Sequence, residues 1–399
     1  MKIKKEEKTI LQHTAKNSKG VTLVALVVTI IVLLILAGVT ISALSGDNGI
    51  LTNASKSKIE TEESSEEESR RLTTLEATTN IDGITHKDSS TGTEKTVEIP
   101  AGFAVSQVEG ENTIEDGLVI IDKNENEWVW IEVPKEITAE TNSSEEIFNA
   151  LNNYTIDYRL SYNTDVWYEG CGLTEDEYNV QKDKMLYSIK ENGGFWIGRY
   201  ESGSETPRKS SSDNLTKMII KQDKYPYNFV TVSQAQYLAN QLSTTQYTCS
   251  LLFDIQWDLT CKYLEEKGAK TQEEIKINSN SWGNYIGDDK NEVAFTIERG
   301  EYSLDDGANF NAVNGKYKKE NSVPVLLTTG ASERNKVLNI YDFAGNVDEW
   351  TLGKIPSIKP SLFRSGPYNG TGTTFPAWTH PNTSTDTSLS KIGFRVTIY

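Results

Sequence analysis

The pattern of apolar and charged residues divides the chain into three regions. Residues 21–44, VTLVALVVTIIVLLILAGVTISAL, contain no charged residue. At about 1.5 Å per residue, a helix of that length crosses a bilayer. Residues 45–80 are rich in Ser, Thr, Glu and Lys with few apolar positions, which predicts a solvated stalk. From residue 81 to residue 399 the pattern is that of a globular domain.

Charges on either side of the apolar segment predict its orientation in a membrane. The residues before it carry lysines, whereas the residues after it include the acidic run ETEESSEEES. By the positive-inside rule, residues 1–20 stay in the cytoplasm and everything after Leu44 is exported. The alternative, a cleaved secretory signal, would have a shorter apolar region that ends in a small-residue site. We therefore expect a single-pass protein of the cell membrane with an extracellular C-terminal domain.

The stretch SKGVTLVALVVTIIVLLILAG resembles the type IV prepilin signature, which has a basic leader, Lys-Gly and a hydrophobic helix that starts with GxTLxxL. The resemblance implies that a prepilin peptidase cuts after Gly20 and methylates the new N-terminus at Val21. The sequence departs from the family at Ala25, where pilins carry a glutamate that helps to place subunits in a filament. The resemblance thus implies a pilin-like membrane anchor, and incorporation into a pilus is the alternative.

Within residues 81–399 the patterns are mixed. Glu127–Pro134, EWVWIEVP, alternates apolar and polar residues, which predicts a half-buried strand. Gly193–Glu201, GGFWIGRYE, predicts a second aromatic strand, and GFRVTIY predicts a short strand at the end of the chain. The intervening sequence is long, polar and rich in Gly, Asn, Ser and Thr. Few helices, short strands and long loops indicate an α+β domain.

Two helices are predicted from start signals and apolar periodicity. SQAQYLANQL begins with Ser233 and Gln236 at capping-box spacing, and one helical stripe holds Ala235, Leu238 and Leu242. DIQWDLTCKYLEEKG begins with Asp254 as the predicted N-cap and ends at Lys267-Gly268. The apolar face of this second helix contains Trp257, Cys261 and Leu264. Cys261 is therefore predicted to be a core residue rather than a reactive one.

Composition excludes several classes of protein. The formal net charge of -17 argues against a nucleic acid as partner, because a phosphate backbone would be repelled. Three histidines and the three cysteines Cys171, Cys249 and Cys261 do not stand in CxxC or HxxxH spacing. A zinc site or a disulfide scaffold is therefore not indicated. The thiols are expected to be buried, with at most one disulfide.

Taken in order, several segments resemble the formylglycine-generating-enzyme (sulfatase-modifying factor) branch of the C-type lectin fold. The matching segments are FWIGRYE, YNFVTVSQAQYLANQL, SLLFDIQWDLTCKYLE, SWGN, NIYDFAGNVDEWT, FRSGPYNG and IGFRV. They cover residues 193–399, and residues 136–183 and 285–321 resemble insertions of this chain's own. The resemblance implies a C-type lectin-like α+β domain carried on the N-terminal helix.

The most specific of these segments is YDFAGNVDEW, Tyr341 to Trp350. In the family this loop commonly holds a calcium ion, and the resemblance implies carboxylate ligands from Asp342 and Glu349 and backbone ligands from Gly345 and Val347. Hard oxygen ligands from a tight turn suit Ca²⁺. The alternative is a metal-free loop in which the two carboxylates cap the turn and pair with nearby cations. On either interpretation the loop organises the fold.

The segment from Arg364 to Gly393 argues against the family's enzyme activity. Formylglycine generation needs a pair of cysteines there, and this segment contains none. Without a thiolate the copper oxidase chemistry of that family is not expected. The segment does contain His380, but a lone histidine among Thr, Pro and Asn predicts a surface residue rather than a base. A residual enzyme of the same superfamily is the weaker alternative.

The same segment has the composition of a binding surface. Tyr and Trp supply rigid contact area, and Asn, Thr and Gly supply adaptable hydrogen bonds. An ordinary solvated loop would have a similar composition. The candidate ligand-binding residues are Tyr368, Asn369, Thr371, Thr373, Thr374, Phe375, Trp378, Thr379, His380, Asn382 and Thr383.

The frame around this segment also resembles the variable proteins of diversity-generating retroelements. In those systems adenine-directed mutagenesis rewrites such a stretch, and Asn and Tyr are frequent because their codons are rich in adenine. The resemblance implies a surface-displayed receptor or adhesin for an extracellular protein or glycan. A minor pilin or pseudopilin with a structural role is the alternative function.

Overall fold

The computed structural model describes residues 84–88, 95–287 and 293–399. These residues belong to one compact unit, Arg70–Tyr399. The predicted leader, apolar helix and stalk at residues 1–20, 21–44 and 45–80 lie outside the described residues. Among the described residues, no helix is both long enough and apolar enough to span a membrane.

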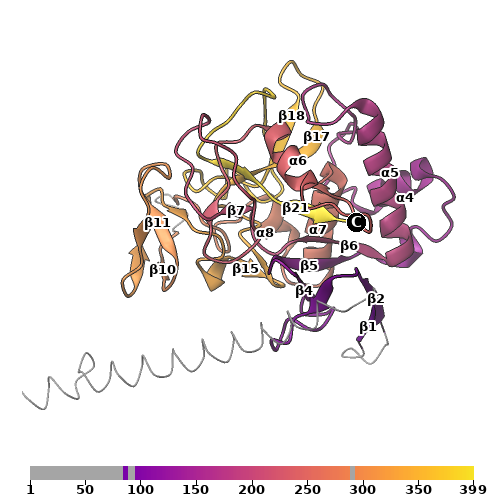
Figure 1. Ribbon diagram of the computed structural model, residues 1–399, viewed down its shortest axis with the longest axis horizontal. Coiled ribbons are helices and arrows are strands. Elements are labelled where there is room, and N and C mark those ends of the chain that lie inside the picture. The colour runs from indigo at the N-terminus through magenta and orange to yellow at the C-terminus, as the bar shows by residue number, and fades with distance from the viewer. Residues whose placement is uncertain (1–83, 89–94, 288–292) are drawn as a thin grey trace, which may run out of the picture. The chain divides into compact units, whose positions relative to one another are not determined.

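The largest sheet has six antiparallel strands in the order β3-β4-β5-β6-β21-β9. Figure 1 labels β4, β5, β6 and β21 of this sheet. The last strand of the chain lies inside this sheet, because β21 pairs with β6 on one side and with β9 on the other. The strands are β3 Phe103–Val105, β4 Val119–Asp122, β5 Glu127–Glu132, β6 Gly194–Gly198, β9 Cys249–Leu251 and β21 Val396–Ile398.

Strand β5 forms where the sequence predicted it, but the prediction of a half-buried strand is wrong. Every residue of β5 except the last is buried. Trp130 packs on Trp196 of the paired strand β6, with ring centroids 4.9 Å apart. The polar residue Glu127 is buried as well, because it accepts a 2.8 Å hydrogen bond from Arg199. The alternating pattern predicted that Glu127 faces solvent, but its ion pair with Arg199 allows it to be buried.

The second sheet has the order β19-β18-β17-β20 and is formed by strands between residues 348 and 394. Its strands are β17 Asp348–Lys354, β18 Ser361–Arg364, β19 Asn382–Thr383 and β20 Ile392–Phe394. Strands β17 and β20 are parallel, and the other pairs are antiparallel. Residues 365–381 connect β18 to β19 as one long loop without helix or strand.

Short strands complete the fold in five smaller sheets. They are β1 Ile84–Asp88 with β2 Lys95–Ile99, β7 Gly203–Ser204 with β8 Tyr225–Pro226, β10 Phe295–Ile297 with β13 Tyr317–Lys319, β11 Glu301–Ser303 with β12 Asn311–Ala312 and β14 Leu326–Leu327, and β15 Lys336–Val337 with β16 Ile340–Tyr341.

The helices are few and mostly short. They are α4 Ser144–Tyr154, α5 Glu175–Asn192, α6 Val232–Asn240, α7 Asp254–Glu266 and α8 Gln272–Lys276, with 3-10 turns η1 Lys135–Ile137 and η2 Glu333–Asn335. Helices α4 and α5 pack on each other, at the opposite end of the domain from β10 and β11 (Figure 1). Helix α7 packs against β5 and β17 and so lies between the two sheets. The predicted α+β class is confirmed.

The helix starts differ from the prediction. Helix α6 begins two residues early, with a capping box made by Thr231 and Gln234. Helix α7 has no side-chain cap, and Asp254 is its first helical residue. The carboxylate of Asp254 instead pairs with Arg364, which explains why it does not cap the helix. The predicted glycine stop is confirmed, because Gly268 follows the helix with a φ of +65°.

The predicted apolar face of α7 is confirmed, since Trp257, Cys261 and Leu264 are all buried. All three cysteines belong to the described part of the chain, and each is a free, buried thiol. Burial raises the pKa of each thiol above its usual value. The expectation of core thiols is therefore met without a disulfide.

Candidate functional site

The loop between β18 and β19 is held by hydrogen bonds to parts of the chain that are distant in sequence. The backbone carbonyl of Ala377 accepts a 3.0 Å bond from the indole of Trp257 on α7. The backbone nitrogen of Gly372 donates to the side chain of Asn280 at 2.7 Å. A Cβ at Gly372 would lie 2.5 Å from the Asn280 backbone nitrogen, so only glycine allows this approach. The loop backbone is therefore fixed although it has no regular secondary structure.

Further anchors hold the two ends of the loop. The backbone nitrogen of Tyr368 donates to the carbonyl of Asn346 at 2.7 Å. The backbone nitrogen of Trp378 donates to the carbonyl of Ile275, and its indole donates to the carbonyl of Tyr158 at 2.5 Å. These bonds join the loop to YDFAGNVDEW, to α8 and to the residues that follow α4.

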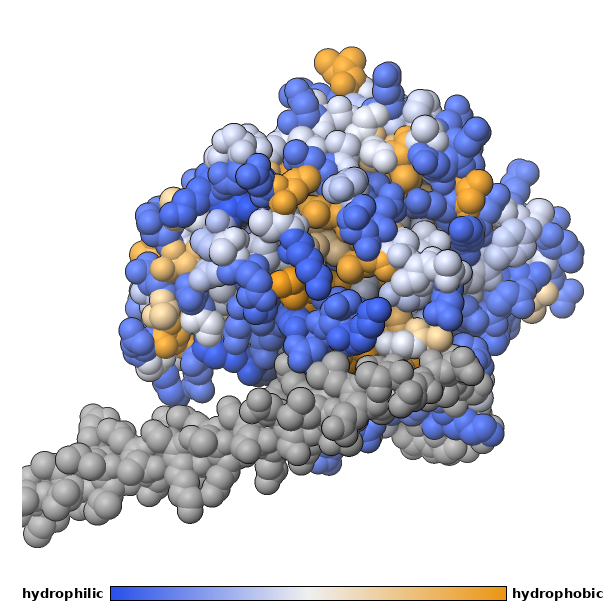
Figure 2. Space-filling view, viewed as in Figure 1, coloured by the Kyte–Doolittle hydropathy of each residue, from blue (hydrophilic) through white to orange (hydrophobic). Residues whose placement is uncertain are grey.

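Most of the predicted ligand-binding residues reach solvent. Asn369, Thr373 and Thr374 are exposed. The half-buried members of the set are Thr371, Phe375, Trp378, Thr379, Asn382 and Thr383. On the face seen in Figure 2, hydrophobic residues lie in small groups among hydrophilic ones.

The prediction of surface exposure is wrong for Tyr368 and His380. Tyr368 is 2 % exposed, packs with Leu326 and Val347, and donates its hydroxyl proton to Asp306. The side chain of His380 is 4 % exposed. Composition suggested a surface for both residues, but the fold turns these two side chains inward as anchors of the loop.

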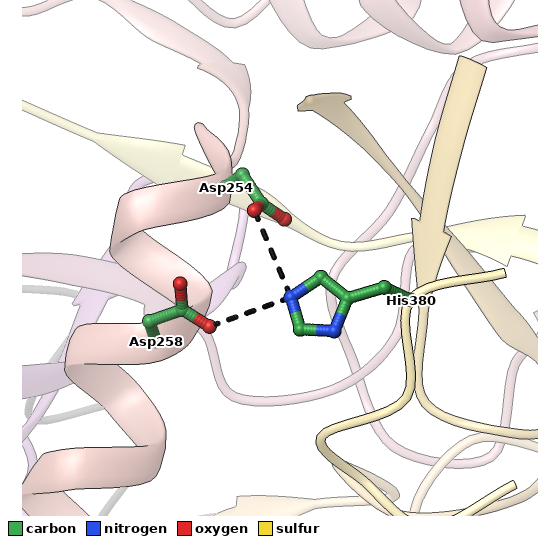
Figure 3. Close-up of side chains that lie close together, drawn as sticks. All are labelled: Asp254, Asp258 and His380. Carbon is green, nitrogen blue, oxygen red and sulfur yellow. Dashed lines mark ion pairs between the residues drawn. The ribbon is translucent and has the colours of Figure 1, made fainter. Parts of the chain in front are cut away.

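His380 lies against a buried cluster of charged residues on α7 and β18 (Figure 3). Asp254 and Asp258 are one turn apart on α7, so both carboxylates point to the same side. The guanidinium of Arg364 bridges them, with bonds of 2.6 Å to Asp254 Oδ1 and 2.7 Å to Asp258 Oδ1. The bridge attaches the start of the loop to α7.

A second guanidinium extends the cluster. Arg159, which follows α4, donates at 2.8 Å to Asp258 Oδ2 and at 2.8 Å to Asp165 Oδ2. The hydroxyl of Thr164 donates to Asp254 Oδ2 at 2.6 Å. The side chains of the five charged residues are at most 1 % exposed. Removal of either guanidinium would leave buried carboxylates with less compensating charge.

The imidazole of His380 has no hydrogen bond in this cluster. Its Nε2 lies 3.8 Å from Asp254 Oδ2 and 3.9 Å from Asp258 Oδ1. Neither ring nitrogen has a hydrogen-bond partner among the described residues, although both are buried. Burial, together with Arg364, holds the pKa of His380 well below its usual range. The imidazole is therefore neutral at physiological pH.

The two carboxylates of α7 have opposite pKa shifts. Burial, reinforced by the charge of Asp254, raises the pKa of Asp258 to about 7 against the effect of Arg364. Burial also acts on Asp254, but the guanidiniums of Arg364 and Arg159 outweigh it and hold its pKa below the usual range. Adjacent carboxylates that cannot both ionise freely commonly separate in this way. The sequence signal for this site was the Asp-x-x-x-Asp spacing on α7, which had been interpreted only as a helix start.

The predicted calcium loop lies elsewhere and is entirely buried. Asp342 Oδ2 accepts a 2.7 Å bond from the backbone nitrogen of Gly330. Glu349 is paired with Arg395 through two bonds, of 2.8 Å and 3.1 Å. Glu201 accepts from the backbone nitrogen of Val347 at 3.0 Å. Asp342 and Glu349 thus already have donors from the protein, whereas Oδ1 of the buried Asp348 in the same loop has no hydrogen-bond partner among the described residues.

These contacts decide how well calcium fits the loop. An ion bound by Glu349 would share this carboxylate with Arg395, and the positive guanidinium would weaken the binding of Ca²⁺. The metal-free alternative, in which Asp342 and Glu349 pair with protein donors, matches the geometry. Backbone ligation by Gly345 and Val347 is not tested by these contacts, and calcium stays a prediction.

A groove of about 660 Å³ lies between α4 and α5, within the region that resembles an insertion. Its lining includes the amides of Asn149, Asn152, Asn163 and Asn179 and the exposed ring of Tyr162. Amides offer both donors and acceptors, which hydroxyl-rich ligands require. The groove is thus a second place where a polar ligand could be bound.

Comparison with known proteins gives only distant matches. No protein-family model and no curated protein matches the sequence. Among solved structures, PvdO from Pseudomonas aeruginosa is 12% identical, over 52% of this chain and 81% of that one, with a TM-score of 0.29. CarF is 16% identical, over 51% and 85%, with a TM-score of 0.27. Treponema denticola variable protein 1 is 13% identical, over 80% and 99%, with a TM-score of 0.21. At TM-scores this low, the matches carry no argument about this chain.

Proposed function

We propose that this protein is a surface-displayed ligand-binding protein that acts through the loop between β18 and β19. In this proposal a pilin-like helix, cleaved after Gly20 by a prepilin peptidase, anchors a C-type lectin-like domain outside the cell. The ligand is an extracellular protein or glycan. The observation that carries the proposal is that the loop backbone is fixed by buried partners while its Asn and Thr side chains face solvent.

A fixed loop of this kind suits recognition. A binding surface that is already ordered loses little conformational entropy when it takes up a ligand. The exposed side chains of Asn369 and Thr373 can donate and accept hydrogen bonds, and Phe375 and Trp378 add rigid apolar area. Substitution of the exposed side chains would change specificity without disturbing the buried anchors.

Binding without catalysis is part of the proposal. The loop segment contains no cysteine, and the thiols of Cys171, Cys249 and Cys261 are buried with raised pKa values. A protonated thiol is a poor nucleophile and a poor metal ligand. The neutral His380 has no serine or cysteine among its described contacts that it could activate.

We further propose that a retroelement diversifies the loop, and sequencing tests this directly. The 3′ end of the gene and its flanks would be sequenced in many sibling clones. We expect a near-copy of the segment that encodes residues 364–393 beside a reverse transcriptase, with mismatches confined to adenines of the copy. Codons of exposed residues such as Asn369 should vary, and the codon of the anchor Ala377 should not.

A sequence that is identical in all clones, with no such copy, would contradict diversification. Recovery of the protein from sheared filaments would instead favour the structural role of a minor pilin.

Binding itself can be measured on a glycan array with the full-length chain. We expect the glycan affinity of the double variant Asn369→Ala, Thr373→Ala to be at least about tenfold lower than that of the wild type. Both side chains are exposed on the loop. The matched control Thr96→Ala, Asn124→Ala changes two exposed residues outside the loop and should bind like the wild type. Equal binding by both variants would refute the assignment of the loop, and an array without any signal would contradict a glycan ligand.

A further inference from the structure

Three potential metal ligands converge where the loop meets α7. Figure 3 shows the imidazole of His380 with Nε2 directed between the carboxylates of Asp254 and Asp258. One atom from each residue lies within 4.8 Å of the other two. Among the described residues, this is the group of His, Cys, Asp and Glu side chains that has such an arrangement.

The two separations from His380 Nε2 to the carboxylate oxygens are those of ligands around one ion. Bonds from a first-row metal to imidazole nitrogen and carboxylate oxygen are about 2.0–2.2 Å long. Two ligands on one ion are then about 3.3–3.9 Å apart for angles of about 105–130°. The 3.8 Å and 3.9 Å distances from His380 Nε2 fall in this range and are too long for hydrogen bonds.

Both ring nitrogens of His380 are buried and lack a hydrogen-bond partner among the described residues. A buried polar nitrogen without a hydrogen bond costs about 1–3 kcal/mol. The ring is held by edge-on packing on Trp378, with centroids 5.0 Å apart, and its neutral state is the one that binds metals. A cation between His380 and the two carboxylates would satisfy Nε2 at once.

The oxygens that face His380 can accept a cation. Asp254 Oδ2 accepts one bond, from Thr164, and lies 3.6 Å from Arg159 Nη1, and Asp258 Oδ1 accepts one bond, from Arg364. A carboxylate oxygen has a second lone pair, and carboxylates that bind metals are usually hydrogen-bonded by outer groups in this manner. Arg364 and Thr164 would serve as those outer groups.

The charge of the cluster limits the affinity. The carboxylates of Asp165, Asp254 and Asp258 form ion pairs with the two guanidiniums of Arg159 and Arg364, so the cluster has one more carboxylate than guanidinium. The nearby guanidiniums repel a divalent ion. We therefore expect a dissociation constant in the micromolar range rather than the nanomolar range of closed zinc sites.

We propose that Asp254, Asp258 and His380 bind one divalent first-row transition metal ion, of the class of Zn²⁺. One imidazole and two carboxylates without a thiolate suit this class, whereas Ca²⁺ prefers six to eight oxygen ligands. The ion joins α7 to the loop between β18 and β19 and so fixes the loop next to Trp378. The site is separate from the loop YDFAGNVDEW and does not depend on the proposed ligand-binding function.

The test is metal binding by the full-length chain, made without a polyhistidine tag and stripped with EDTA. Isothermal titration with Zn²⁺ should show one ion per chain. Titration with Co²⁺ should give visible d–d absorption bands of a site with nitrogen and oxygen ligands. A wild-type chain that shows neither stoichiometric Zn²⁺ nor these bands overturns the proposal.

Two variants and one control assign the ligands. His380→Gln loses no hydrogen bond, so it should fold, and its affinity for Zn²⁺ should fall at least about a hundredfold. Asp258→Asn should weaken binding as well. His86→Gln changes a histidine outside the cluster and should bind Zn²⁺ like the wild type. Wild-type affinity in both His380→Gln and Asp258→Asn would place the ion elsewhere and refute the site, with folding of each variant checked by near-UV circular dichroism.

Discussion

Replacement of Arg395 by methionine should destabilise the domain severely. Arg395 is fully buried between the two sheets and binds Glu349, which is also fully buried, through two charged hydrogen bonds. The same guanidinium donates at 2.8 Å to the backbone carbonyls of Gly198 and Tyr341. Methionine fills a similar volume but cannot donate to any of these oxygens.

The expected loss of stability follows from the groups that Arg395→Met leaves without a partner. A buried ion pair that loses one partner costs about 3–5 kcal/mol. Each carbonyl that loses its donor adds about 1–2 kcal/mol. Burial already raises the pKa of Glu349, so protonation of Glu349 in the variant limits the total. We expect the free energy of unfolding to fall by about 5 kcal/mol, a large part of the 5–15 kcal/mol typical of a domain.

The double variant Arg395→Met, Glu349→Leu separates the charge from the hydrogen bonds. The double variant removes the uncompensated carboxylate, so its free energy of unfolding should be about 2–3 kcal/mol higher than that of Arg395→Met. The loss from the two carbonyls without donors should remain. Urea unfolding followed by tryptophan fluorescence measures the stability of Arg395→Met, of Glu349→Leu and of the double variant. Lys318→Met, which removes an exposed charge, serves as control. The reasoning is refuted if Arg395→Met unfolds within about 1 kcal/mol of the wild type, or if the double variant equals the sum of the single ones.

Two further predictions concern pH and calcium. Lys319 is buried and donates to the carbonyls of Tyr285 and Val293, and burial with Arg334 lowers its pKa to about 8. Because the unfolded chain keeps a pKa near 10.5, stability should rise between pH 8 and pH 10.5 by up to about 3 kcal/mol. Urea midpoints of Lys319→Met should lack this rise, and an identical slope in variant and wild type would disprove it. The calcium prediction requires that EGTA lower the melting temperature and that added Ca²⁺ restore it, whereas pairing of Glu349 with Arg395 predicts no change.

Local sequence patterns predicted those helices and strands whose buried residues are apolar and close together in the sequence. The predicted apolar residues of α7, such as Trp257 and Cys261, and the aromatic strand β6 are of this kind, although β6 is buried on both faces and α7 also buries polar residues such as Gln256. The N-cap of α7 was missed for the opposite reason. Asp254 is a good capping residue by type, but its partner Arg364 lies 110 positions further along the chain. No local pattern contains that information.

In the loop between β18 and β19, too, the local sequence predicted the environment of some side chains but not of others. Its composition predicted a surface of Asn and Thr, and the exposed positions Asn369 and Thr373 agree with it. Tyr368 and His380 have the same composition around them but are buried by contacts with Asp306 and Asp254, from other parts of the chain. Which side of an irregular loop faces inward depends on those contacts, so composition cannot give it.

The position of β21 within the largest sheet has a consequence for biosynthesis. Thr397 bonds to Trp196 on β6, 201 positions earlier, and β9 reaches the sheet only through β21. Closing so long a stretch of chain makes folding slow. Until residues 396–398 have left the ribosome, β6 and β9 have open edges and this domain cannot complete its core. A premature stop before Val396 would therefore release a chain with two strands that lack this neighbour, which a quality-control protease would be expected to degrade.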